Sequence, residues 1–200
     1  MTLSEPTPPA TLTALLIADE RILWWGAPQQ KFMLMPRDGV LIPFSLVWGG
    51  FSIFWEWNVL ASKAPASFAL FGLPFVAVGL FLIGGRFLVD AWLRARTTYA
   101  LTDRRVLIVR TGAWPSVRAL FLDRLPETTL LAGRGGRGSI RFGTASPVFE
   151  RHGGRGSFGA WVASLDPAPH FLGIDEAPRV YASIQQHAQA GAPGGRTASV

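Results

Sequence analysis

The sequence predicts an α+β protein in which a two-helix transmembrane hairpin is inserted after the first strand of an antiparallel sheet or small barrel, with a helix near the C-terminus. Three observations predict this fold class. Hydrophobic residues make up 49% of the 200 residues and charged residues only 16%, well below the ~25% that is usual for soluble domains. Two long apolar runs lie close together in the first half of the chain. Short β-rich runs, separated by glycine-rich turns, fill most of the second half.

The residues before the hairpin are expected to form a flexible segment and then a strand. Residues 1–19 include "SEPTPPA", a composition that is typical of disorder. Residues 20–36 include "RILWWG", which predicts the first strand of the folded domain. The first basic residue is Arg21, so the basic start of a secretory signal is not expected.

Residues 38–93 are predicted to form the transmembrane hairpin, with helices over 40–60 and 67–90. Each run is close to the ~20 residues that a helix needs to cross ~30 Å of hydrocarbon. Neither run shows amphipathic spacing, which argues against a one-sided surface helix. The short loop "ASKAPA" between them predicts an antiparallel pair. The alternative interpretation is a pair of buried core helices in a soluble protein.

The distribution of basic residues predicts the orientation of the hairpin. The connecting loop has only Lys63, whereas basic residues lie on both flanks. These flanking residues are Lys31, Arg37, Arg86, Arg94 and Arg96. The positive-inside rule therefore places both termini in the cytoplasm, in an integral protein of the cytoplasmic (inner) membrane.

Arg86 and Asp90 lie at the end of the second apolar run, and Glu56 lies within the continuation of the first. Arg86 and Asp90 are four residues apart, so on a helix they share a face and can pair. One interpretation is an intramembrane site. The other, which their positions at the run ends favour, is that the side chains extend toward the headgroups.

The segment after the hairpin is basic and rich in strands. Residues 94–155 contain twelve arginines against four acidic residues, a local excess of +8, whereas the whole chain carries +6. This excess predicts an anionic partner. The short β-rich runs with regular turn signals predict an antiparallel sheet or small barrel. They are "TTYALTDRRVLIVRTG", "VRALFLD", "TTLLA", "SIRFG" and "FGAWVA".

A final helix is predicted over 175–189, followed by a disordered tail at 191–200. Asp175 is a suitable N-cap, and Pro178 lies in the first turn. Apolar residues at helical spacing give one stripe that faces a core. They are Val180, Tyr181, Ile184 and Ala188.

The order of these elements resembles the bacterial pleckstrin-homology-like (PH-like) membrane proteins. The resemblance rests on "ERILWWGAPQQ" before the hairpin, "RTTYALTDRRVLIVRTG" directly after it, "SIRFG", and the closing "FLGIDEAPRVYASIQ", and it covers most of residues 20–186. It implies a PH-like domain made of 20–36 and 94–190, folded as a partly open β-barrel that the C-terminal helix caps. It implies no catalytic activity.

A glycine-rich stretch, "LLAGRGGRGSIRFG", contains the spacing G-x-G-x-x-G at Gly133, Gly135 and Gly138. A dinucleotide site needs a strand before this motif and a helix after it. Here the strand-like "SIRFG" follows, so a hairpin loop with glycines at positive φ is predicted instead. RNA binding by "GRGGRGS" is the other alternative, and neither nucleotide nor nucleic acid is expected as a partner.

No metal or cofactor is expected. The three histidines lie far apart in sequence, without the spacing of metal ligands, and the chain has no cysteine. They are His152, His170 and His187.

These observations predict a non-enzymatic scaffold or adaptor module, anchored at the cytoplasmic face, that binds anionic lipid headgroups of the inner leaflet or a protein partner. The candidate lipid-binding residues are Arg94, Arg96, Arg104 and Arg105. Each basic residue near an anionic surface contributes ~1 kcal/mol. In the simpler alternative, the arginines only orient the protein in the membrane.

Two further alternatives concern the hairpin. In the first, the chain is an obligate non-catalytic subunit of a larger membrane complex, and small residues allow close helix contact. These are Gly49, Gly50, Gly72, Ala77 and Gly79. In the second, it is a membrane enzyme that uses Glu56, Arg86 and Asp90.

Overall fold

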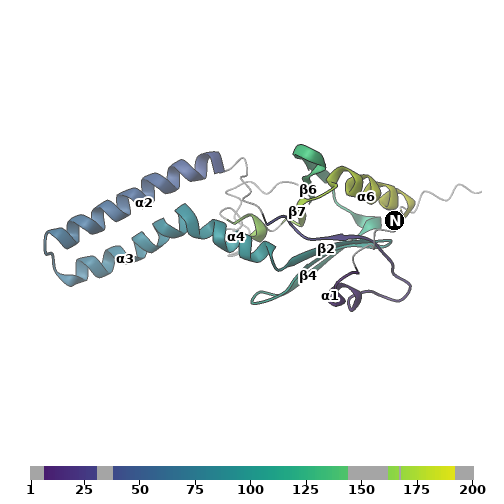
Figure 1. The fold of residues 1–200 in the computed structure, drawn as a ribbon, viewed down its shortest axis with the longest axis horizontal. Coiled ribbons are helices and arrows are strands. Elements are labelled where there is room, and N and C mark those ends of the chain that lie inside the picture. The colour runs from purple at the N-terminus through teal and green to yellow at the C-terminus, as the bar shows by residue number, and fades with distance from the viewer. Residues whose placement is uncertain (1–6, 31–37, 144–161, 167, 192–200) are drawn as a thin grey trace, which may run out of the picture. The chain divides into compact units, whose positions relative to one another are not determined.

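The computed structural model describes residues 7–30, 38–143, 162–166 and 168–191. The chain divides into two compact units. A sheet unit is made of Met1–Gln30, Leu93–Pro147 and Pro167–Val200, and a hairpin unit is made of Lys31–Trp92 and Val148–Asp166. Figure 1 shows the course of the chain through both.

The hairpin unit contains two long apolar helices that run side by side (Figure 1). The first is α2 (Asp38–Ala61), and the second begins as α3 (Ala66–Leu80). The second continues through a π-helical turn, η1 (Phe81–Gly85), into α4 (Arg86–Arg94). Both the 24-residue and the 29-residue helix are long and apolar enough to cross a membrane. The two predicted helices are therefore confirmed, with ends within a few residues of 40–60 and 67–90.

Small and polar side chains line the contact between α2 and α3. Ser45, Ser52 and Glu56 are buried on α2, and the two serine hydroxyls donate to backbone carbonyls of their own helix. A Cβ placed on Gly79 of α3 would lie 2.8 Å from the Cα of Gly49. The two backbones thus come close together at a point where both residues lack side chains.

The sheet unit contains a four-stranded antiparallel sheet, sheet A, with strand order β1-β2-β3-β4. Its strands are β1 (Ile22–Gly26), β2 (Thr97–Thr102), β3 (Arg105–Arg110) and β4 (Ser116–Phe121). The hairpin unit is inserted between β1 and β2, which pair directly. This confirms the predicted insertion after the first strand.

A second antiparallel sheet, sheet B, has the order β5-β6-β7. Its strands are β5 (Thr128–Ala132), β6 (Gly138–Phe142) and β7 (His170–Ile174), and helix α6 (Ala177–Gly191) follows. Short 3₁₀ turns connect or flank these strands: η2 (Leu122–Arg124), η3 (Arg134–Gly136) and η4 (Ala163–Leu165). The predicted tail lies outside the described residues beyond Gly191.

The main core lies between the two sheets and α6. The rings of Tyr99 and Phe171 pack together at a tilt, with centroids 4.6 Å apart, and the Tyr99 hydroxyl accepts a hydrogen bond from the Leu172 amide. On α6, Val180 and Ile184 are buried in this core, so the predicted apolar stripe is confirmed. At one edge the sheets meet through a backbone hydrogen bond from the Gln29 amide to the Gly173 carbonyl.

The opposite face of sheet A is covered by the N-terminal segment. Helix α1 (Ala10–Thr13) buries Leu12 completely against Ala100, Leu107 and Val109. The prediction of a flexible segment over 1–19 is therefore wrong for α1 and the residues that follow it. The apolar side chains of this segment gain burial that its proline-rich composition did not indicate.

One further prediction is confirmed in part and two need correction. The described strands form two antiparallel sheets, as the sheet alternative predicted, and no closed barrel. The predicted strand "FGAWVA" lies partly outside the described residues, and its last residue, Ala163, begins η4. Helix α6 begins at Ala177, so Asp175 is not its N-cap; its carboxylate accepts hydrogen bonds from Gln29 and Arg137 instead.

Candidate functional site

The candidate site is the end of sheet A at which the chain leaves α4. Arg96 lies two residues beyond the last residue of α4, and its carbonyl accepts a hydrogen bond of 2.9 Å from the Thr111 amide. This bond continues the β2–β3 ladder, in which Thr97 pairs with Arg110. It therefore holds the loop 111–115, between β3 and β4, beside Arg96. We call Arg96, Arg110 and the loop 111–115 the helix-proximal corner.

Glycine shapes this corner. Gly112 has φ +94°, which favours glycine, and a Cβ there would lie 2.7 Å from the Arg96 Cδ. The aliphatic part of the Arg96 side chain therefore lies over Gly112. Trp114, two residues further along, is 59% exposed. The corner thus combines two arginines with an exposed, amphipathic ring.

Arg94 lies in the same stretch of chain but is not on the surface. Its side chain is buried, and its Nη1 donates a hydrogen bond of 3.0 Å to the carbonyl of Gln29. Arg94 thus ties the end of α4 to the segment that follows β1. A buried guanidinium with a backbone partner is a structural feature of the sheet unit rather than a lipid ligand.

Arg104 and Arg105, the other two predicted lipid ligands, lie at the opposite end of β2. This strand has six residues. At ~3.4 Å per residue it is about 20 Å long, and Arg96 and Arg104 lie beyond its two opposite ends. The Arg104 side chain is exposed, at the turn between β2 and β3. The four predicted arginines therefore do not form one cluster: Arg94 is buried, Arg105 pairs with Glu20, and the exposed Arg104 lies at the other end of β2 from Arg96.

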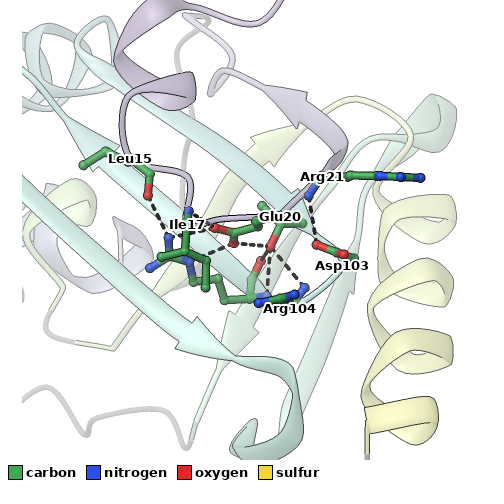
Figure 2. Close-up of polar contacts among 8 residues, drawn as sticks. Leu15, Ile17, Glu20, Arg21, Asp103 and Arg104 are labelled. Carbon is green, nitrogen blue, oxygen red and sulfur yellow. Dashed lines mark hydrogen bonds and ion pairs between the residues drawn. The ribbon is translucent and has the colours of Figure 1, made fainter.

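Arg105 is held in an internal network with Glu20. Figure 2 shows Glu20 among the polar contacts of this region. Its Nε donates to Glu20 Oε1 at 2.8 Å and its Nη2 to Oε2 at 2.9 Å, a bidentate ion pair. The same Nη2 donates to the carbonyl of Leu15 at 2.7 Å. Glu20 also accepts hydrogen bonds from the Ile17 amide and the Thr102 hydroxyl. The network fastens the N-terminal segment to the end of sheet A.

The protonation of this network follows from its hydrogen bonds. Burial alone would raise the pKa of Glu20, but hydrogen bonds from Arg105, Ile17 and Thr102, with the charge of Arg105, outweigh burial and lower it. The hydrogen bond to Glu20 raises the pKa of Arg105. Both groups therefore stay ionised at neutral pH, so the ion pair between Glu20 and Arg105 is intact at that pH.

Four ionisable residues of the hairpin-unit helices are buried: Asp38, Glu56, Arg86 and Asp90. The Arg86 guanidinium pairs with Asp38 at 2.7 Å and with the ring of Phe87, so its ion-pair partner is not Asp90, four residues along the same helix. Asp90 Oδ1 instead accepts hydrogen bonds from the amide and hydroxyl of Ser164, each 2.8 Å long. The interpretation that these two side chains extend toward headgroups is wrong, because Arg86 and Asp90 have internal partners.

Glu56 lies against Gly72 of the neighbouring helix. A Cβ on Gly72 would collide with the Glu56 Oε2, so only glycine leaves room for this carboxyl. That oxygen is buried without a hydrogen-bond partner. Glu56 lies on α2, more than a helix turn from the C-terminal end of that helix. Among the described residues, the partners of Arg86 and Asp90 are other residues, and Glu56 does not join them in one site.

The glycine-rich motif forms the turn between β5 and β6, as predicted. Gly135 and Gly136 have φ of +70° and +75°, and the Gly133 amide donates to the carbonyl of Arg137 at 2.7 Å. The two strands pair along their whole length: Thr128 lies opposite Phe142 at one end, and Ala132 lies opposite Gly138 at the other. The geometry is that of a β-hairpin and lacks the helix that a dinucleotide's pyrophosphate needs.

Comparison of the chain with family models, with curated proteins and with solved structures finds no match in any of the three.

Sequence reasoning missed two residues of the helix-proximal corner, Arg110 and Trp114. The signal was present in the predicted β-hairpin over 97–112. In an antiparallel hairpin the last residue of the second strand returns to the first residue of the first strand. Arg110 therefore had to lie opposite Thr97, directly after the apolar helix. Proximity in sequence found Arg94 and Arg96, but strand pairing was needed to find their neighbours.

Proposed function

We propose that this protein is a membrane-anchored, PH-like scaffold module without catalytic activity, whose helix-proximal corner binds anionic headgroups at the inner leaflet. In this proposal α2 and the helix from α3 to α4 cross the membrane, and the sheet unit lies on the cytoplasmic side. The order of one strand, an apolar helical hairpin, further antiparallel strands and a last helix supports the PH-like assignment.

The observation that carries the proposal is the hydrogen bond from the Thr111 amide to the Arg96 carbonyl. Arg96 is separated from an apolar helix by one residue, so a helix that crosses the membrane keeps it close to the headgroups. The bond brings the loop 111–115 to the same level. The exposed Trp114 and the half-buried Arg110, whose side chain lies on the opposite face of sheet A from that of Arg96, are then at that level too.

The chemistry of the corner suits an anionic lipid surface. Tryptophan is enriched at membrane interfaces, where its ring meets acyl chains and its N–H stays near water. Each arginine near an anionic leaflet contributes ~1 kcal/mol. Two arginines and one tryptophan give modest binding, which suffices for a domain whose tether already holds it at a high local lipid concentration.

The alternative, an obligate subunit of a larger membrane complex, rested on small residues of the hairpin that would contact a partner helix, and most of these residues lie inside the hairpin. Gly49, Gly72 and Gly79 are occupied in the contact between α2 and α3, so they are not offered to a partner helix. Gly50 and Ala77 are exposed. A pair of small residues on two helices supports a partner helix less well than the five that the sequence alone indicated.

The test uses the absence of cysteine in the chain. Single cysteines are introduced by Ala113→Cys in the loop and by Arg104→Cys at the far end of β2, both exposed positions, and each is spin-labelled. The full-length protein is placed in nanodiscs of neutral or anionic lipid. We expect the label at 113 to become accessible to oxygen and protected from a water-soluble nickel complex, most strongly with anionic lipid, while the label at 104 stays in water.

The outcomes separate the competing arrangements. Equal protection of both labels would mean that sheet A lies flat and that Arg104 also contacts lipid, as the sequence predicted. A label at 113 that stays in water with both lipids would overturn the proposal. As a further check, Arg96→Gln combined with Arg110→Gln should remove the difference between anionic and neutral lipid at position 113.

A further inference from the structure

The outer edge of β4 is an open strand edge. β4 pairs with β3 along its whole length, and none of the described residues pairs with its other side. The other sheet edges have neighbours: the Tyr181 hydroxyl of α6 donates to the Thr128 carbonyl of β5, and Gln29, after β1, donates to Gly173 of β7. Edge strands of this kind are templates for another strand.

The register identifies which backbone groups the edge offers. The Leu122 amide donates to the carbonyl of Arg104, so these residues are a hydrogen-bonded pair in the register that joins Phe121 to Arg105. Bonded and non-bonded pairs alternate in an antiparallel ladder. The amides and carbonyls of Leu120 and Arg118 therefore point toward β3. Those of three residues point away from it: Val117, Ala119 and Phe121.

The same three residues share one face of the sheet, and that face is apolar and exposed. Val117 is 53% and Phe121 51% exposed. They lie beside Val109 and Arg105 of β3, on the face that α1 covers over the middle of sheet A. An added strand with apolar side chains on this face would cover both residues.

The surroundings of the edge are basic. The exposed Arg118 projects from the opposite face of β4, and the side chain of Arg124, just after the strand, is 86% exposed. Arg104 is exposed opposite Leu122. Among the acidic side chains at this end of the strand, Asp123 pairs with Arg124 at 3.5 Å, and Asp103 accepts a hydrogen bond from the Arg21 amide. A segment with acidic side chains on this face complements that charge.

A second copy of this chain fits the edge less well. The register that uses all the outward groups of two copies places Ala119 opposite its counterpart. Arg118 of each copy would then lie diagonal to the same arginine on one face, within reach of like-charge repulsion.

From these observations we propose that β4 binds an extended, acidic and apolar segment of a partner protein as a fifth strand of sheet A. Apolar side chains at alternate positions cover Val117 and Phe121, and acidic side chains between them face Arg118. Backbone hydrogen bonds to Val117, Ala119 and Phe121 supply affinity, and the side chains supply specificity. This inference goes beyond lipid binding and does not depend on it.

The test uses full-length protein in nanodiscs of neutral lipid, so that anionic lipid binding does not contribute. The probe is a short synthetic peptide in which valine alternates with glutamate, and the matched probe has lysine in place of glutamate. With the glutamate peptide we expect residue-resolved hydrogen exchange to slow at Val117, Ala119 and Phe121. The amides of Arg118 and Leu120, already bonded to β3, should not change.

Two variants test the mechanism separately. Ala119→Pro removes a donor that points away from β3, a position where edge strands tolerate proline, and should abolish the added protection. Arg118→Glu should shift the preference by about three- to fivefold toward the lysine peptide. This charge exchange remains decisive if Ala119→Pro does not fold.

Three results would overturn the proposal. The first is unchanged exchange at the three amides with saturating glutamate peptide. The second is protection that grows with protein concentration in the absence of peptide, which would assign the edge to a second copy. The third is equal binding of both peptides by the parent protein. The spin-label result at position 113 affects none of these, so the two proposals fail independently.

Discussion

At the scale of single residues, the Glu20–Arg105 pair explains how a proline-rich N-terminal segment becomes ordered. The Glu20 side chain is completely buried, and Arg105 is 13% exposed. The carboxylate accepts hydrogen bonds from two parts of the chain. The Ile17 amide lies close to it in sequence, and the side chains of Thr102 and Arg105 lie at the end of sheet A. Removing one partner of a buried pair leaves the other without compensation. This network therefore has a structural role, and Arg105 is committed to it.

We predict that Glu20→Gln lowers the free energy of unfolding of the sheet unit by about 1.5–3 kcal/mol at neutral pH, the range for hydrogen bonds to charged groups. Because the folded pKa of Glu20 is lowered, the ionised pair stabilises fully above the ordinary carboxyl value of 4.5, and its contribution is lost as the pH falls through the folded pKa. Thermal unfolding in detergent across this range should show the parent and variant converging in acid.

The matched control for this prediction is Glu127→Gln, which removes an equal charge from an exposed position. It should leave thermal stability nearly unchanged at neutral pH. A constant difference between Glu20→Gln and the parent at all pH values would show that the loss comes from packing rather than from the ion pair.

At the scale of elements, the hairpin depends on glycines in the contact between its helices. Gly79→Ala places a methyl group against the backbone of Gly49, and backbone cannot move aside as a side chain can. We predict a loss of about 1–3 kcal/mol, the usual cost of overpacking. Gly50→Ala is the control, since nothing lies within 4 Å of the added Cβ. Thermal unfolding in mild detergent compares the two, and equal effects would contradict the close contact.

Sequence reasoning predicted the elements that local patterns determine. The apolar runs gave α2 and the helix from α3 to α4, and the "TTYALTDRRVLIVRTG" stretch gave β2 and β3. It missed β7, because "HFLGI" is short and its glycine weakens the strand pattern; the strand forms by pairing with β6. It also missed the burial of Leu12, which depends on a sheet formed by residues almost ninety positions away.

The candidate site was only partly predictable for the same reason. Arg96 follows the helix in sequence, so its position near the hairpin could be predicted. Separating it from Arg104 required the direction and length of β2, and excluding Arg105 required knowing that Glu20 lies beside it. Charge composition gives the number of arginines, whereas the fold decides which of them remain on the surface.

At the scale of the whole molecule, the two proposed surfaces belong to one strand hairpin. The loop 111–115 precedes β4, so the helix-proximal corner and the open edge are consecutive along the chain. A partner strand on β4 would cover Val117 and Phe121 and would leave Arg96 and Arg110 to the lipid. The module would thus bind lipid and a partner protein at the same time, which is what an adaptor at a membrane requires.

The arrangement of the whole chain across the membrane can be tested with the same cysteine-free background. Lys63 lies in the loop between α2 and α3, exposed and with φ +52°, and the basic residues on both flanks of the hairpin predict that this loop faces the outside. We expect Lys63→Cys to react with a membrane-impermeant maleimide added to intact cells. Arg104→Cys, in the sheet unit, should react only after the cells are opened. The reverse pattern would contradict a cytoplasmic sheet unit and remove the inner leaflet as its lipid partner. Labelling of both positions in intact cells would mean that the hairpin does not cross the membrane, since two residues on opposite sides of a bilayer cannot both be reached.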